Sequence, residues 1–75
     1  MSEPNDEKVN ENLRPEEAIQ LAMERERRAR DFYQHCAQTV RDPGVRKMFE
    51  FLAKEEVNHL ALLEREYDRF IAREG

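Results

Sequence analysis

The sequence is poor in residues that interrupt helices and in residues that cross-link small domains. Its 75 residues include two glycines, three prolines, one cysteine and no tryptophan. The single Cys36 cannot form a disulfide within the chain, so a disulfide-stapled fold is excluded and a reducing interior is favoured. The remaining residues are rich in Glu, Arg, Leu and Ala, which is typical of long helices and not of strands. We therefore expect an all-α fold.

Two further absences bear on partners and location. No apolar run approaches the length of a membrane-spanning helix, and the first residues lack the apolar core of a signal peptide. The 17 acidic and 13 basic residues are interspersed, and they form no basic stripe that nucleic acid would bind. We expect a soluble cytoplasmic protein with no membrane or nucleic-acid partner.

The pattern along the chain predicts a polar leader followed by two helices. Residues 1–13 lack periodicity and are expected to form a flexible leader, with a helical hairpin over 14–73. Proline at position 15 and the two acids after it favour a helix start, which gives a first helix of about 15–41. Asp42 and Pro43 suit the cap and first position of a second helix, about 43–72. Because the connection is short, the helices should pack antiparallel.

Each predicted helix carries one stripe at spacings of three and four residues, which describes a single helix face. The first stripe comprises Ile19, Ala22, Glu26, Ala29, Tyr33, Cys36 (or Ala37) and Val40. The second comprises Val45, Phe49, Leu52, Glu56, His59, Leu63, Tyr67 and Phe70. Burying the charged members, Glu26, Glu56 and His59, is unfavourable unless something pairs them.

These three polar residues fall at one height along the hairpin. Glu26 precedes Asp42 by 16 residues, and Glu56 and His59 follow it by 14 and 17. At about 1.5 Å per residue they lie roughly 24, 21 and 26 Å from the turn. Glu56 and His59 are three residues apart on one helix face and can bind the same ion. We predict a metal site of Glu26, Glu56 and His59.

The short chain predicts association with other copies, because it buries only a marginal core alone. Two hairpins related by a two-fold axis would form a four-helix bundle with four carboxylates and two imidazoles at its centre. Such a set balances two divalent cations and suits iron, with manganese or zinc as substitutes. A homodimer is therefore the minimum. Apolar residues outside the stripes indicate a higher homo-oligomer, namely Phe32, Phe51, Leu62 and Ile71.

Each site residue also has an ordinary structural interpretation. Glu26 and Arg30 have the i,i+4 spacing of a surface ion pair. Glu56 could be a surface acid if the helix phase differs by one position, and His59 could pair with a carboxylate without metal. Tyr33 could be a core aromatic whose hydroxyl finds a partner, and a ligand carboxylate would serve as that partner.

Several of these residues together carry a family resemblance. Glu26, Phe32-Tyr33, Asp42-Pro43 and the stretch Leu52-Ala53-Lys54-Glu55-Glu56-Val57-Asn58-His59 resemble one half of a rubrerythrin or ferritin-like protein. The resemblance spans about Ala18 to Tyr67. It is nearest to the short two-helix encapsulated-ferritin type, in which two subunits build one four-helix bundle.

The resemblance implies that Glu26, Glu56 and His59 are iron ligands and that Tyr33 lies beside them as a fourth catalytic residue. The implied activity is ferroxidase chemistry, the oxidation of Fe(II) by dioxygen at a subunit interface, with two iron ions per dimer site. One alternative is a rubrerythrin-like peroxidase that needs an external electron-donor protein. Another is a metal-binding or structural helical oligomer without catalysis.

The sequence departs from this family pattern at three points. Arg25 and Arg28 stand where the relatives carry acidic residues that guide iron inward. No shell-targeting extension follows Gly75, so the sequence gives no support to residence inside a protein compartment and leaves a shell protein open as a partner. The cysteine pairs of a rubredoxin domain are absent, so a complete rubrerythrin is not expected.

Overall fold

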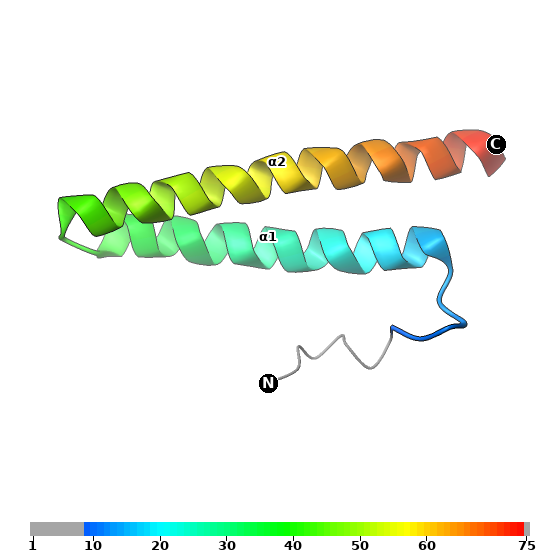
Figure 1. Cartoon of the computed structure of the whole chain (residues 1–75), viewed down its shortest axis with the longest axis horizontal. Helices are drawn as coiled ribbons and strands as arrows, with labels where there is room; N and C mark the ends of the chain where they lie inside the picture. Colours follow the sequence, from blue (N-terminus) through cyan, green and yellow to red (C-terminus); the bar gives the residue numbers. More distant parts are fainter. Residues whose placement is uncertain (1–8, 75) are drawn as a thin grey trace.

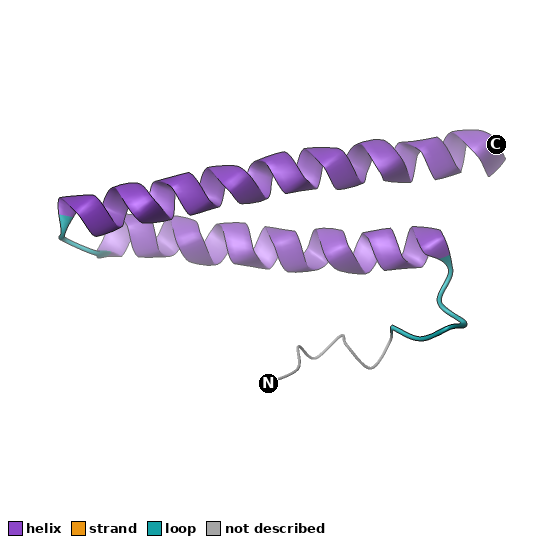
Figure 2. Ribbon diagram, viewed as in Figure 1, coloured by secondary structure: helices purple, strands orange, loops and turns teal. Residues whose placement is uncertain are grey.

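The chain forms two long helices that lie side by side and antiparallel (Figure 1). The computed structural model describes residues 9–74, without the side chains of 73 and 74. Helix α1 spans Pro15–Thr39 and helix α2 spans Pro43–Glu74, and residues 9–74 contain no strand (Figure 2). The predicted all-α hairpin is confirmed. The predicted flexible leader, 1–13, lies mostly outside the described residues.

Helix α1 begins at the proline that the sequence pattern favours. Pro15 occupies the first turn, where its missing N–H leaves no helical hydrogen bond unmade. The Glu17 carboxylate accepts a hydrogen bond from the Arg14 N–H at 3.2 Å. This contact satisfies a backbone donor that the helix itself cannot pair.

Helix α1 ends at Thr39, before the expected end at about residue 41. Val40 is extended, with φ −69° and ψ 144°, although its N–H still donates to the Cys36 carbonyl at 2.9 Å. The residue before a proline is disfavoured from helical conformation, and an N-cap residue is itself non-helical. Asp42 has both properties, so the chain leaves α1 early enough to form the connection.

Helix α2 begins with a side-chain cap. The Asp42 carboxylate accepts a hydrogen bond from the Val45 N–H at 2.8 Å, the geometry of an acidic N-cap. Pro43 follows as the first helical residue. The helix continues to Glu74, two residues past the expected 72, a difference within the usual uncertainty of helix ends.

The contact between the helices is narrow. Among the described residues only Ala53 and Leu60 are buried, at 6% and 5% exposure. Each follows by one position a member of the predicted stripe, Leu52 or His59, and one position is a rotation of about 100° on a helix. The stripe therefore lies to one side of the centre of the α1–α2 contact, and most of its members, Leu52 among them, are half-buried.

The hairpin is one layer thick. Its two helices lie side by side (Figure 1), and the shortest principal-axis extent of the Cα atoms is 12 Å. The 9.0 kDa chain exposes 6021 Å², whereas a globular monomer of that mass exposes about 4,900 Å². Several large apolar side chains are exposed, with Phe32, Phe51 and Leu62 each more than half exposed. A second layer is needed to bury this surface.

Both helices are amphipathic and carry charged residues throughout. Surface ion pairs lie along their outer faces, for example between Arg69 and Glu66 at 2.8 Å. Within residues 9–74, neither helix has a stretch long and apolar enough to cross a membrane.

Candidate metal centre

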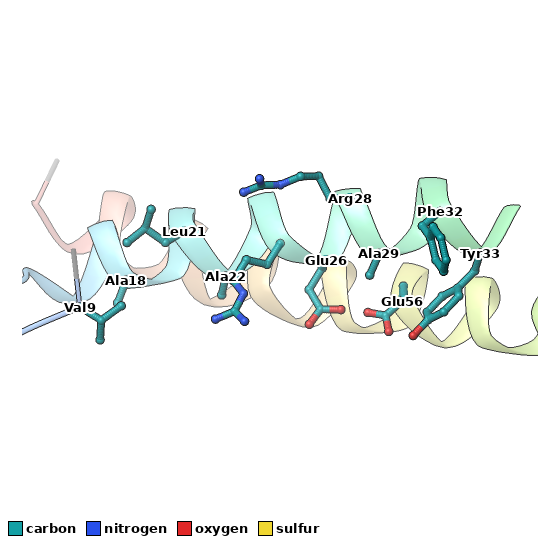
Figure 3. A pocket seen from close by; sticks show the side chains of 11 residues that line it. Val9, Ala18, Leu21, Ala22, Glu26, Arg28, Ala29, Phe32, Tyr33 and Glu56 are labelled. Carbon is teal, nitrogen blue, oxygen red and sulfur yellow. The ribbon is translucent and has the colours of Figure 1, made fainter. Parts of the chain in front are cut away.

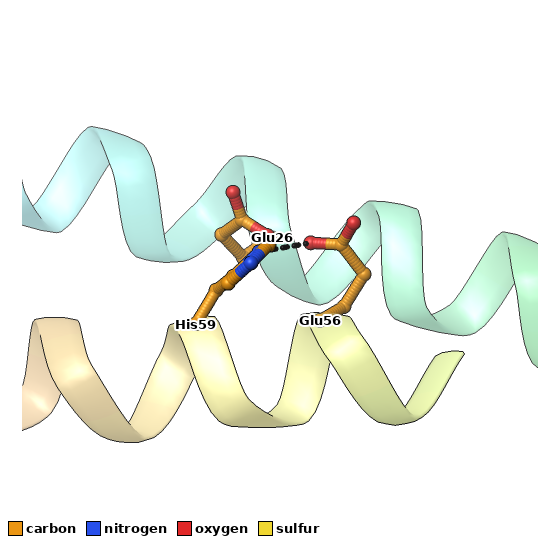
Figure 4. Close-up of side chains that lie close together, drawn as sticks. All are labelled: Glu26, Glu56 and His59. Carbon is orange, nitrogen blue, oxygen red and sulfur yellow. Dashed lines mark hydrogen bonds and ion pairs between the residues drawn. The ribbon is translucent and has the colours of Figure 1, made fainter. Parts of the chain in front are cut away.

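The structure brings together the three residues that the stripes single out. Glu26 comes from α1, and Glu56 and His59 come from successive turns of α2 (Figure 4). One donor atom from each lies within 4.8 Å of the others. Among the described residues, this is the only group of three or more Asp, Glu, His or Cys side chains placed so closely together. The antiparallel register thus places both helices' polar stripe members at one level.

The imidazole of His59 lies between the two carboxylates. Its Nδ1 atom is 3.3 Å from Glu26 Oε2 and 3.4 Å from Glu56 Oε2. Both distances are longer than the usual N–H···O hydrogen bond of about 2.7–3.2 Å. A single Nδ1–H can form a good hydrogen bond with only one of the two carboxylates. The three side chains therefore point towards a common position without forming short hydrogen bonds with one another.

The site is open on one side. The side chain of Glu56 is 16% exposed and that of Glu26 is 28% exposed, whereas that of His59 is 52% exposed. The carboxylates therefore lie close to the hairpin interior, and the imidazole forms the outer edge. A ligand or a second chain can approach from this edge.

The donor set fits a hard or intermediate divalent cation. Two carboxylate oxygens and one imidazole nitrogen suit iron, manganese or zinc, and no thiolate is near to favour a softer ion. Three protein donors leave the coordination of such an ion incomplete. The residues present thus fit a metal and leave coordination positions for water or further ligands.

A groove of about 650 Å³ runs along α1 beside this group (Figure 3). Glu26, Glu56 and Tyr33 lie in its wall, so stripe residues of both helices open into one space. The other lining residues are mostly small or apolar: Val9, Ala18, Leu21, Ala22, Arg25, Arg28, Ala29 and Phe32. Small side chains here leave room for another helix to approach closely.

Tyr33 is held by aromatic neighbours. Its ring stacks on Phe49 of α2 with centroids 6.2 Å apart, and Phe32 meets its edge at 5.7 Å. The residue is half-buried and lies in the same groove as the two carboxylates. The core-aromatic interpretation and the position beside the candidate metal group are therefore compatible. The sequence did not predict that Tyr33 packs against Phe49, because membership of a stripe does not determine which aromatic rings are in contact.

The alternative ion pair between Glu26 and Arg30 does not form. Arg30 instead contacts the neighbouring Asp31, with Nη2 at 3.0 Å and Nε at 3.1 Å from Oδ1. Glu26 faces His59 across the helix contact. The surface interpretation of Glu26 is thereby disfavoured by the geometry.

Comparison with known proteins gives one match. The family model described as Rubrerythrin matches residues 2–67. That range includes all of α1, most of α2 and the three residues of the candidate metal group. No curated protein and no solved structure matches the chain.

Proposed function

Since the chain belongs to the rubrerythrin family, we propose that it is a ferroxidase that oxidises Fe(II) with dioxygen at a site shared by two copies. The observation that carries this proposal is the convergence of Glu26, Glu56 and His59 on one point. Family membership supports an iron-binding helical protein. The three donors supply a place on this chain where iron would bind.

Two copies are proposed because one hairpin offers half of what the chemistry needs. Two negative carboxylates balance one divalent ion, and two such sets meeting at a two-fold axis would balance two ions. The stripe that carries them is only half-buried within one hairpin, and the hairpin is a single layer. Covering that face with a second copy would bury apolar surface and complete the ligand set in one step.

Iron is the substrate in this proposal. Glu26 and Glu56 provide anionic oxygens that favour the more highly charged product ion, and His59 provides a neutral nitrogen. Two Fe(II) ions release one electron each, and dioxygen takes up both electrons with two protons to become hydrogen peroxide. Tyr33, in the groove beside the carboxylates, is proposed to orient one of them through its hydroxyl.

The test is aerobic addition of Fe(II) to the purified full chain, with dioxygen uptake and Fe(III) absorbance as readouts. Wild type should oxidise iron at least tenfold faster than buffer. Glu56→Ala and His59→Ala should fall to the buffer rate. Glu64→Ala, which removes an exposed acid of the same helix, should retain the wild-type rate.

Three other outcomes would contradict the proposal. Oxidation at the buffer rate by wild type, with Fe(II) still bound, would favour a non-catalytic metal-binding protein. Faster reaction with hydrogen peroxide than with dioxygen would favour a peroxidase that relies on an external electron donor. Full activity in the Glu56 and His59 variants would place the site elsewhere.

A further inference from the structure

The first turns of α2 carry an exposed basic set, which comprises Lys47, Phe51 and Lys54. Their spacings of four and three residues place them on one side of the helix. Phe51 precedes the buried Ala53 by two positions, a rotation of about 200°, so this side faces away from α1. The Phe51 ring is 61% exposed, and neither lysine forms an ion pair with another described residue. One hairpin thus leaves an aromatic ring uncovered between two lysines.

The first turns of α1 carry an acidic set with the same spacings, which comprises Glu17, Leu21 and Glu24. Both glutamates are exposed, and Leu21 is half-buried. Together with Leu13 and Gln20 they line a second groove, of about 440 Å³. This groove combines two leucines, which can pack against an apolar side chain, with two carboxylates, which can pair with cations.

The two sets cannot meet within one chain. Glu17 precedes Asp42 by 25 residues, whereas Lys47 follows it by five. At about 1.5 Å per residue these positions are roughly 38 and 8 Å from the turn, so they lie about 30 Å apart along the hairpin. The acidic set is near the open end and the basic set is near the turn (Figure 1). A contact between them therefore joins two copies of the chain.

The two sets match residue for residue at an offset of 30 positions. When two helices pack side by side and parallel, residues at equal heights meet, as in a parallel coiled coil. In this alignment each glutamate of the acidic set meets a lysine of the basic set, and Leu21 meets Phe51. Further along the same alignment, the exposed Phe32 and Leu62 lie at equal heights and border the contact. On the outward sides of the helices no acid meets an acid, and no arginine or lysine meets another.

We infer that the basic set of one copy packs on the acidic set of another, in a contact separate from the shared metal site. Phe51 is the apolar anchor of this contact, since it enters the groove beside Leu21. Exposed ion pairs contribute little stability by themselves, so the lysines chiefly determine partner and register. The acidic set can accept them, because the Glu24 pair with Arg28 is long, at 3.8 Å, and a single oxygen of Glu17 is used by the Arg14 N–H.

This contact is heterologous, because each copy presents a different set to each of two neighbours. Association through it therefore continues beyond two copies, unlike a two-fold contact that is complete in a dimer. The contact is also independent of the proposed iron chemistry, since neither set contains a residue of the candidate metal group.

The test is sedimentation velocity of the full chain at low ionic strength, over a range of concentrations. Wild type should form species larger than a dimer. Lys47→Glu/Lys54→Glu and Glu17→Lys/Glu24→Lys should each weaken this larger association at least tenfold. An equal mixture of the two variants should restore it, because each reversed set then meets a set of opposite charge.

Arg27→Glu/Arg41→Glu is the matched control, because it makes the same change in net charge as the lysine reversal, at exposed positions outside both sets. It should associate as wild type does. If reversal at position 17 lowers the helix content, Glu24→Lys and Lys54→Glu, mixed in the same way, decide the question.

Two results would overturn the inference: a wild type no larger than a dimer, or a mixture no larger than its separate variants. Unchanged association in both variants, with polyglutamate bound by wild type but not by Lys47→Glu/Lys54→Glu, would also overturn it and would assign the basic set to an acidic partner. Aerobic Fe(II) oxidation at the wild-type rate in the Lys47→Glu/Lys54→Glu variant separates this contact from the proposed ferroxidase site.

Discussion

His59 approaches two carboxylates with a single nitrogen atom. A bound cation would suit this arrangement better than a single proton on that nitrogen. A proton on Nδ1 bonds well to one carboxylate only, and the second is left at 3.4 Å or 3.3 Å. A divalent ion can attract all three donors together. Residues placed for such an ion are not expected to contribute much to the stability of the metal-free fold.

Glu56→Gln tests this separation of binding from stability. The amide keeps the size of the side chain and still accepts a hydrogen bond from His59, but it removes one of two neighbouring negative charges. We expect Mn(II) affinity, measured by calorimetry, to fall at least tenfold. The free energy of unfolding of the metal-free protein in urea should change by no more than about 0.5 kcal/mol. A parallel loss of both quantities would make Glu56 a structural residue.

Tyr67 lies far from the turn, near the other end of the hairpin, and it allows a second test at the residue scale, of a contact between the two helices. Gln20 of α1 donates a hydrogen bond from Nε2 to the Tyr67 hydroxyl of α2 at 2.8 Å. This bond is exposed, so water replaces much of it when it is lost. Tyr67→Phe should lower the free energy of unfolding by about 0.5 kcal/mol. In a double-mutant cycle with Gln20→Ala the second substitution should add almost nothing, and full additivity would contradict the contact.

At the scale of the elements, the connection between the helices is short and fixed by Asp42. Its carboxylate accepts the Val45 N–H, a backbone donor that α2 cannot pair internally. The same residue is held out of helical conformation by Pro43. Asp42 therefore lies between the two helices, and its side chain caps the second.

Asp42→Ala removes this cap without changing the proline. We expect the free energy of unfolding to fall by about 1 kcal/mol, the usual contribution of an acidic N-cap. The loss should be visible in urea denaturation followed by circular dichroism. Arg41→Ala, which changes the exposed neighbour, should stay close to wild type, and an equal loss there would show that the effect is not due to capping.

The sequence was sufficient to predict the helices, their antiparallel pairing and the meeting of Glu26 with Glu56 and His59. Each follows from local rules: helix periodicity, cap chemistry and a constant rise per residue. The buried positions Ala53 and Leu60 were not predicted as the contact line. A stripe predicts which side of a helix is apolar. The contact between two helices buries only part of that side, so the stripe does not predict which of its residues the contact buries. The neighbour of Tyr33 likewise depends on tertiary packing.

At the scale of the whole molecule, the apolar surface that one hairpin leaves uncovered is the feature that most needs a partner. Leu63 is half-buried and belongs to the same stripe as Glu56, two turns along α2. A charge at this position would be placed in the proposed four-helix interior, where it has no counter-charge. Leu63→Glu should therefore disrupt association.

Sedimentation and thermal unfolding measure this effect. The wild type should be a dimer or larger and should melt at higher temperature as its concentration rises, because association stabilises only the folded chain. Leu63→Glu should sediment as a monomer and lose helix content. Ala61→Glu adds the same charge at an exposed position and should remain associated. A stable, folded wild-type monomer would refute the shared site.

The proposed assembly of the site from two identical chains would also have a genetic consequence. A single codon change at position 26, 56 or 59 would alter both halves at once, so neither half could be specialised without the other. Pro15 and Glu74 lie at the same end of the hairpin (Figure 1). A tandem duplication joined across that end would place both halves in one polypeptide, and from then on the two sets of ligands could evolve independently.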